Sequence, residues 1–185
     1  MAVFKNSQKD NLPSKIYLDS AFLVDSLIET KDNIFKHKKA VSFAERLQKS
    51  NTTIICSKLC YIEYWNAVFG IKCREVCGNK KIVNILNSQK ETEVFDWVKE
   101  KFNNLIMFFE LLTKREKLKI EESIGIIEIP KDLDNNARET AVEYRLPIYD
   151  AIHYYTMLNT NTKDIITDNI DDFKHLKNIT IWKYR

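Results

Sequence analysis

Acidic residues follow four short apolar runs along the chain, each at a point where a strand is predicted to give way to a helix. They are Asp19 in KIYLDSAFL, Glu63 in TTIICSKLCYIEYW, Asp150 in RLPIYDAIHYY, and an acid of the group Asp168, Asp171 and Asp172 in DIITDNIDDFKHL. In an open parallel sheet such junctions share the carboxyl edge of the strands, where ligands bind. We therefore expect these acids, distant in sequence, to meet in one cleft.

A cleft lined with carboxylates has a characteristic chemistry. Crowded carboxylates repel one another, and some become protonated unless a cation lies among them. Mg²⁺ suits such a site because it binds a few carboxylates together with waters and phosphate oxygens. A metal-bound water loses a proton near neutral pH and can attack phosphorus in line. The acids therefore predict a Mg²⁺ or Mn²⁺ site for phosphodiester hydrolysis, which is the chemistry of a nuclease.

Three of the acids also have a structural explanation. Asp19 and Asp168 stand where the N-cap of a following helix is expected, and aspartate is a favoured N-cap residue. Asp150 falls in the first turn of its predicted helix, where the helix dipole stabilises a carboxylate. Taken singly, each of these acids is as well explained by helix capping or the dipole as by catalysis.

Glu63 is harder to explain structurally. The helix predicted from an N-cap at Ser57 to about Glu75 carries an inward stripe of apolar and small residues: Leu59, Ile62, Asn66, Phe69, Gly70 and Cys73. By helical spacing Glu63 falls in the same stripe, where an acid is costly unless something pairs with it. Glu63 is therefore the acid whose functional interpretation is favoured most strongly.

Two further side chains accompany the acids. Thr167 places a hydroxyl beside the same cleft, where it can hydrogen-bond a carboxylate or a metal-bound water. His153 follows Asp150 by three residues and could contact a scissile phosphate, although a partly exposed packing histidine is the favoured interpretation. A serine–histidine or cysteine–histidine nucleophile is not supported, because spacing places no third group to orient it.

The elements that must position these residues alternate along the chain. Strands are predicted at 16–18, 52–56, 124–130, 164–167 and 179–182, with helical segments between them. This order predicts a parallel sheet of about five strands that is covered by helices on both faces. The polar residues 1–14 are predicted to form a loose arm. Residues from about 78 to 122 are predicted to form an inserted helical hairpin, with a short helix over 81–87 and a long helix over 91–119.

Composition favours a single domain over residues 1–185. The hydrophobic share of 44% and the charged share of 30% are typical of a soluble globular protein. No apolar stretch approaches the roughly 18 residues that span a bilayer, and the amino terminus lacks the apolar segment of a secretory signal. We therefore expect a cytoplasmic protein with no membrane association. The net charge of +3 permits contact with nucleic acid.

The cysteines and glycines exclude several other classes of protein. Each pair of cysteines is spaced by four residues, which favours buried thiols over a zinc site: the pairs are Cys56 with Cys60 and Cys73 with Cys77. The three glycines cannot form the glycine-rich motif of a dinucleotide-binding protein or of a P-loop nucleotidase.

At these residues the chain resembles the PIN-domain ribonucleases, particularly the VapC-type toxins of toxin–antitoxin pairs. The ordered segments IYLDS, SKLCYIE, LPIYDAIH and IITDNIDDF carry the resemblance, which covers about residues 15–75 and 124–183. The last segment includes the pattern T-x-N-x-x-D-F, formed by Thr167, Asn169, Asp172 and Phe173. The resemblance implies a three-layer α/β/α fold and a metal-dependent endoribonuclease that is often dimeric.

The resemblance also implies roles for the acids. Asp19 and Asp150 match the principal metal ligands, and Glu63 matches the acid that helps to hold the metal and its water. The family places a fourth acid either two residues after the threonine or at the aspartate of the D-F pair. Because Asn169 occupies the former position, Asp172 is the first choice for this role and Asp168 the second.

The predicted protein is thus an Mg²⁺- or Mn²⁺-dependent endoribonuclease, the toxin of a toxin–antitoxin pair. Its partners would be RNA, an antitoxin and a second copy of the chain, with the helical hairpin as the contact for a protein. One alternative is a PIN-type nuclease of RNA processing or structured DNA. Another is a non-catalytic PIN-like binding module, which Asn169 and the modest charge favour. A phospho-acceptor domain is a more distant alternative.

Overall fold

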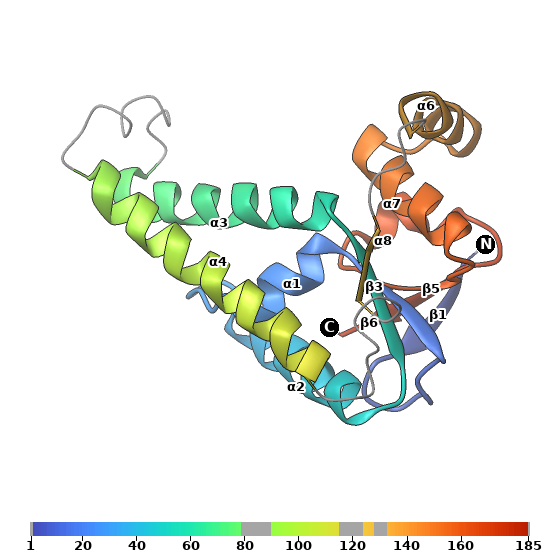
Figure 1. The fold of residues 1–185 in the computed structure, drawn as a ribbon, viewed down its shortest axis with the longest axis horizontal. Coiled ribbons are helices and arrows are strands. Elements are labelled where there is room, and N and C mark those ends of the chain that lie inside the picture. Colours follow the sequence, from blue (N-terminus) through green and yellow to red (C-terminus); the bar gives the residue numbers. More distant parts are fainter. Residues whose placement is uncertain (1, 79–89, 115–123, 128–132, 185) are drawn as a thin grey trace.

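The computed structural model describes residues 2–78, 90–114, 124–127 and 133–184. The strands are β1 (Val3–Asn6), β2 (Lys15–Leu18), β3 (Thr53–Ser57), β4 (Ile124–Ile127), β5 (Asp164–Ile166) and β6 (Thr180–Lys183). The helices are α1 (Ser20–Leu27), α2 (Ile34–Lys49), α3 (Leu59–Cys77), α4 (Glu91–Lys114), α6 (Leu133–Tyr144), α7 (Ile148–Asn159) and α8 (Ile170–Phe173). All strand pairs are parallel, in the order β1-β6-β5-β2-β3-β4 (Figure 1).

Alternating side chains of the strands feed two hydrophobic cores, one on each face of the sheet. Ile16, Leu18 and Ile166 belong to the core that is completed by α1, α2, α3 and α4. Tyr17 and Ile165 point the other way, into the core that is completed by α6, α7 and α8. Alternation of this kind is the two-residue period of a strand, and burial on both faces explains its apolar sequence. The predicted three-layer α/β/α fold is confirmed.

The strand order reverses at the centre of the sheet. The chain runs from β2 to β3 and β4 in one direction, and then returns so that β5 pairs with the other side of β2. The loops that follow β2 and β5 therefore leave the sheet in opposite directions and open a crevice at the carboxyl edge. Ligands bind at such a switch point in open α/β sheets. Asp19 follows β2 directly, and Thr167 follows β5.

The amino-terminal arm differs from its prediction. The five predicted strands are present, although residues 128–130 of the third lie outside the described residues. Residues of the supposedly loose arm form β1, which pairs with β6 in register from Val3 with Thr180. The sheet consequently has six strands rather than about five. The physical reason is that β6 would otherwise end the sheet with unpaired backbone groups, which a short edge strand satisfies.

The long helix of the predicted hairpin packs against α3 in the described part of the chain. The long helix is present as α4, which ends among the described residues at Lys114, and its partner is α3. Ring contacts join the two helices, between Tyr61 and Phe109 and between Trp65 and Phe102. The pair projects from the sheet as an arm (Figure 1). The short helix predicted over 81–87 and the end of the insertion lie outside the described residues.

The face that helix α3 presents to the core differs in part from the predicted one, since Leu59 and Cys73 are buried as predicted. Ile62 and Asn66, both expected to point inward, are exposed, whereas Tyr64 and Val68 are buried. The prediction had the correct period but the wrong rotation, because Tyr64 packs inside between the neighbouring helices. Glu63 therefore lies at the border between core and cleft. Ser57 is also not the N-cap as predicted, since it ends β3 and Lys58 precedes the helix.

Within the described part of the chain, no helix is both long enough and apolar enough to cross a membrane.

Candidate metal centre at the carboxyl edge

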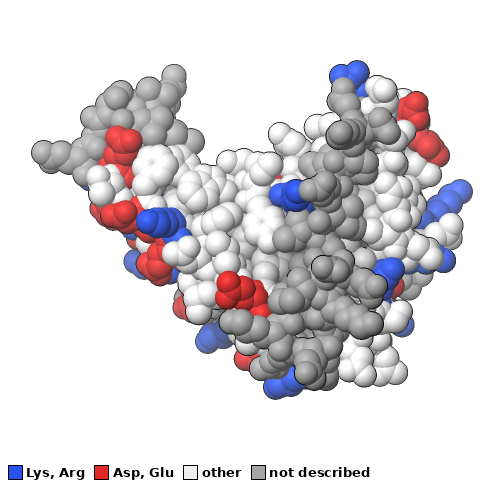
Figure 2. All heavy atoms as spheres, viewed as in Figure 1, with Lys and Arg blue, Asp and Glu red and all other residues white. Residues whose placement is uncertain are grey.

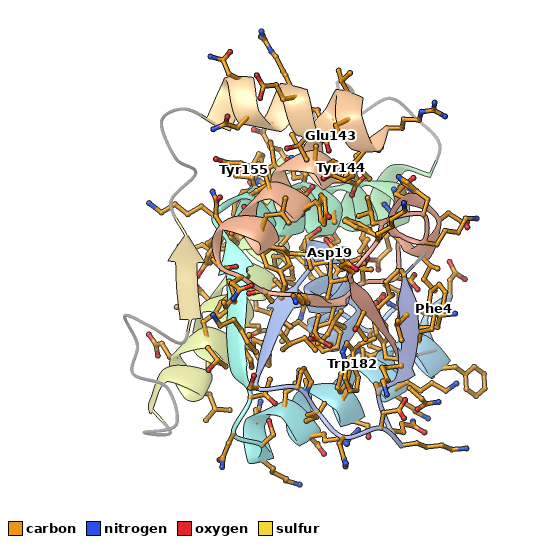
Figure 3. The ribbon with its side chains drawn as sticks, turned by 90° about the vertical axis from the view of Figure 1, so that its right-hand side faces the viewer. Phe4, Asp19, Glu143, Tyr144, Tyr155 and Trp182 are labelled. Carbon is orange, nitrogen blue, oxygen red and sulfur yellow. The ribbon has the colours of Figure 1, made fainter. Side chains whose placement is uncertain are left out.

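Three ionisable side chains from three different elements meet at the carboxyl edge of the sheet. Asp19 follows β2, Glu63 lies in the second turn of α3, and His153 lies in α7. Each offers one ligand atom, and these atoms lie within 4.8 Å of one another. Asp19 stands at the upper end of the strands in Figure 3. We call these three residues together with Asp150 the cleft cluster.

Asp19 is held by two hydroxyl groups. Thr167 donates to Oδ2 of Asp19 at 2.6 Å, and Ser20 donates to Oδ1 at 3.3 Å. The backbone N–H of Asn169 donates in turn to the Thr167 hydroxyl, at 2.9 Å. Among the described residues the Asp19 carboxylate makes no cap hydrogen bond to α1, so helix capping does not explain this acid. The structure therefore places the Thr167 hydroxyl on a carboxylate, one of the two contacts considered from the sequence.

Glu63 is paired with His153. Oε2 of Glu63 lies 2.8 Å from Nε2 of His153, and the Glu63 side chain is 23% exposed while that of His153 is 1% exposed. Burial raises the pKa of Glu63, but the hydrogen bond and charge of His153, with a hydrogen bond from Ser20, outweigh it and lower the pKa. Glu63 is thus a carboxylate in the cleft. Its side chain is less buried than the predicted position in the inward stripe of α3 implies.

The prediction for His153 as a partly exposed packing residue is wrong. Its ring is buried, with Nδ1 2.8 Å from the Tyr17 hydroxyl and Nε2 3.8 Å from Oδ1 of Asp19. Burial lowers the pKa of His153, but the hydrogen bond with Glu63 and the charge of Asp19 raise it well above its usual value. Sequence reasoning missed this contact because only the fold brings α3 against α7. The available signal was the spacing of three from Asp150, which puts both on one helix edge.

Asp150 occupies the first turn of α7, as predicted, and its environment is negative. The pKa of Asp150 is raised to about 6, first by burial and then by the charges of Asp172, Asp19 and Glu63, while the charge of His153 lowers it. Nδ2 of Asn169 approaches Oδ1 of Asp150 at 3.5 Å. The cleft cluster therefore holds more negative charge than its own cation neutralises.

The candidates for the fourth acid lie in different environments. Asp172 is half-buried, and its charge acts on Asp150. Asp168 instead forms an ion pair with Lys36 of α2. Asp171 is exposed and pairs with Lys174 at 2.6 Å. Of these three acids, Asp172 is the one whose charge acts on Asp150, which favours it over Asp168 for the fourth position.

Asp168 belongs to a second group of charged residues. Nζ of Lys36 also lies 2.9 Å from Oδ2 of Asp25, which accepts a hydrogen bond of 2.7 Å from the Tyr184 hydroxyl. We call Asp25, Lys36, Asp168 and Tyr184 the lysine cluster. Here the ammonium group lies between the two carboxylates, so the acids have a cation supplied by the chain itself.

A cysteine nucleophile is excluded by the environment of Cys60. Its thiol lies beneath the cleft, is fully buried, and is 3.8 Å from the Ser57 hydroxyl. Burial raises the pKa of Cys60 well above its usual value, and neighbouring Cys56 raises it further. A buried thiol with a raised pKa is unreactive. Cys56, Cys60 and Cys73 are all buried, in agreement with the prediction from their spacing.

The donor atoms of the cleft cluster fit a divalent metal ion. Carboxylate oxygens are the ligands that Mg²⁺ prefers, and Mn²⁺ also accepts imidazole. Burial and, after it, the charges of Asp172, Asp19 and Glu63 raise the pKa of Asp150, and a bound cation would favour its ionised form. Residues Asp19, Glu63 and His153 form a group that could hold a metal ion.

Comparisons with known proteins add a structural likeness. Neither a protein-family model nor a curated protein matches this sequence. The structure is similar to one chain of the crystal structure of VapBC2 from Rickettsia felis bound to a DNA fragment from their promoter, with a TM-score of 0.49 and 14% sequence identity. The match covers 90% of this chain and 96% of that chain. With 14% sequence identity and a TM-score of 0.49, this likeness carries no conclusion about function, which depends on the geometry of the site.

Proposed function

We propose that this protein is a metal-dependent endoribonuclease of the PIN type, which hydrolyses RNA phosphodiester bonds with Mg²⁺ or Mn²⁺. The observation that carries the proposal is the meeting of ligand atoms of Asp19, Glu63 and His153 within 4.8 Å of one another at the switch point of the sheet. The choice of RNA and of the PIN family depends on the sequence resemblance described above. The net charge of +3 is compatible with a polyanionic substrate.

Each residue of the site has a part in this proposal. Asp19 and Asp150 would bind the metal directly, with Glu63 and Asp172 completing the carboxylate set and Asp168 held by Lys36. Thr167 and Ser20 orient Asp19 through their hydrogen bonds. When bound, the metal would stabilise charge on the phosphate and lower the pKa of an attacking water. Asp150 would hold the cation in its ionised form, which predominates above its pKa of about 6.

Cleavage of a labelled single-stranded RNA tests the proposal directly. We expect metal-stimulated internal cleavage by the wild-type protein, none after chelation by EDTA, and none by Asp19→Asn or Asp150→Asn. A DNA of the same sequence and a branched DNA, assayed in parallel, separate the ribonuclease from the alternative nuclease. Calorimetric titration with Mg²⁺ and Mn²⁺ completes the test. If the wild-type protein binds neither ion, the non-catalytic module is the better interpretation.

The arm formed by α3 and α4 is the proposed contact for a protein partner, either an antitoxin or a second copy. Helix α4 exposes apolar side chains, including Met107 at 64% and Leu111 at 41%. They border a hollow of about 420 Å³ that also includes Leu27 and Phe108. In Figure 2 the side of the arm that faces α6 and α7 is largely uncharged, and charged side chains gather along its outer edge. Apolar surface of this kind indicates association.

Sedimentation of the wild-type protein and of Met107→Glu tests this contact. We expect the wild-type protein to self-associate and the variant to be more monomeric, because the new charge would be buried in the contact. Circular dichroism should show that the variant is folded, since Met107 is exposed. A wild-type protein that is monomeric at all concentrations contradicts the dimer.

A further inference from the structure

A buried chain of hydrogen bonds leads from the sheet to the cleft. The Tyr17 hydroxyl contacts Nδ1 of His153 at 2.8 Å, and Nε2 of His153 contacts Oε2 of Glu63 at 2.8 Å. Tyr17 is completely buried in β2, two residues before Asp19, and the two rings meet edge to face at 5.7 Å between centroids. Both ring nitrogens of His153 therefore have a partner, and the packing fixes the plane of the ring.

The partners determine which nitrogen of His153 carries a proton. An imidazole nitrogen without a proton is an acceptor, and a carboxylate is an acceptor only. Without a proton on Nε2, two acceptors would face each other at 2.8 Å, namely Nε2 of His153 and Oε2 of Glu63. A proton on Nε2 makes the contact a hydrogen bond, whether Nδ1 accepts from the Tyr17 hydroxyl or, in the charged ring, donates to it.

We infer that His153 is a positioning residue, which holds the Glu63 carboxylate through Nε2–H, and that Tyr17 orients His153 for this purpose. Outer partners of a metal-binding carboxylate set its direction and its affinity for the ion. The inference deepens the proposed function, since it treats Glu63 as part of the metal site. It also makes a choice that the distances leave open, because His153 could otherwise bind a metal through a bare Nε2.

Histidine nitrogen-15 NMR of the wild-type protein provides the first test. We expect a directly bonded proton on Nε2 of His153 without added metal, and the same proton after saturation with Mg²⁺. A bare Nε2 in either condition overturns the inference. Assignment is simplified because the chain has only three histidines.

The Tyr17→Phe variant provides the second test, with Tyr64→Phe as its matched control. Both tyrosines are completely buried, but the Tyr64 hydroxyl donates to the carbonyl oxygen of Lys101, away from the cleft. We expect Tyr17→Phe to weaken Mg²⁺ binding about tenfold in calorimetry and to broaden or shift the His153 nitrogen signals. Tyr64→Phe should leave both unchanged. Equal affinities in the two variants contradict a role for Tyr17.

The inference and the proposed function can fail separately. If the wild-type protein carries the Nε2 proton but binds neither Mg²⁺ nor Mn²⁺, the nuclease proposal fails, and the hydrogen-bond chain stands as an arrangement of Tyr17, His153 and Glu63 alone. If metal binds and RNA is cleaved while Nε2 is bare, His153 is a ligand and only the inference fails.

Discussion

The cleft cluster and the lysine cluster both gather acidic side chains near the carboxyl edge of the same sheet, but they are neutralised differently. In the lysine cluster, Lys36 lies between Asp25 and Asp168, so that the acids have a cation from the chain itself. In the cleft cluster, Asp19, Glu63 and Asp150 share His153, and burial and neighbouring acids raise the pKa of Asp150 to about 6. Two carboxylates share one ammonium group in the lysine cluster, whereas three acids share one imidazole in the cleft cluster. The comparison indicates that the cleft cluster has the larger surplus of negative charge, which the proposed metal ion would offset.

The sharpest test of this difference is to neutralise one acid in each cluster. We expect Asp19→Asn to reduce RNA cleavage at least about 100-fold, because a ligand of the metal is lost. Asp25→Asn should leave Mg²⁺ affinity within about threefold of wild type and instead lower the free energy of unfolding, because Asp25 is buried and bonded to Tyr184. Cleavage and calorimetry measure the two effects. Equal losses of Mg²⁺ affinity would show that the clusters act as one.

Removal of the ammonium group tests the lysine cluster itself. We expect Lys36→Met to lower the free energy of unfolding by about 2 kcal/mol, because Asp25 and Asp168 would lose their shared cation. This value is below that of a fully buried pair, since the Lys36 side chain is 31% exposed. Urea denaturation measures the change. A variant that is as stable as wild type but binds Mg²⁺ poorly would place Lys36 in the metal site.

Metal binding should depend on pH through Asp150. Its pKa of about 6 means that the carboxyl group is mostly ionised at pH 7 and mostly protonated at pH 5. Because a proton competes with the metal, we expect Mg²⁺ affinity to fall roughly tenfold between these pH values. Asp150→Asn should bind more weakly, with a flatter pH dependence. An affinity of the wild-type protein that is constant over this range contradicts the raised pKa.

The smallest expected effect is a gain of stability in Asp150→Asn without metal. A raised carboxyl pKa means that the folded state binds the proton more tightly than the unfolded state. The ionised form therefore destabilises the fold, increasingly from about pH 4 to pH 6 and fully above it. We expect the variant to gain about 1 kcal/mol at pH 7.5 and nothing at pH 3.5, a modest value because the side chain is half-buried. Thermal unfolding with EDTA measures it.

Much of the fold could be predicted because local sequence patterns indicate where strands and helices lie. Short β-branched runs such as TTIIC indicate the strands, and the helices predicted between them indicate a parallel sheet. The amino-terminal strand β1 could not be predicted, since all four of its residues are exposed, the apolar Val3 and Phe4 included, and the strand forms against the edge that β6 offers. The rotation of α3 was also beyond the sequence, because the packing of Tyr64 decides it.

The sequence by itself determined that Asp19, Glu63 and Asp150 would follow strands or begin helices, and hence that they would share one edge of a parallel sheet. Only the tertiary structure decided which acids keep their surplus charge. It placed Lys36 against Asp168 and the buried His153 against Glu63, contacts between elements that lie far apart in the chain. The physical reason is that a residue's position along a strand or helix is a local property, whereas its charge balance depends on which elements pack against it.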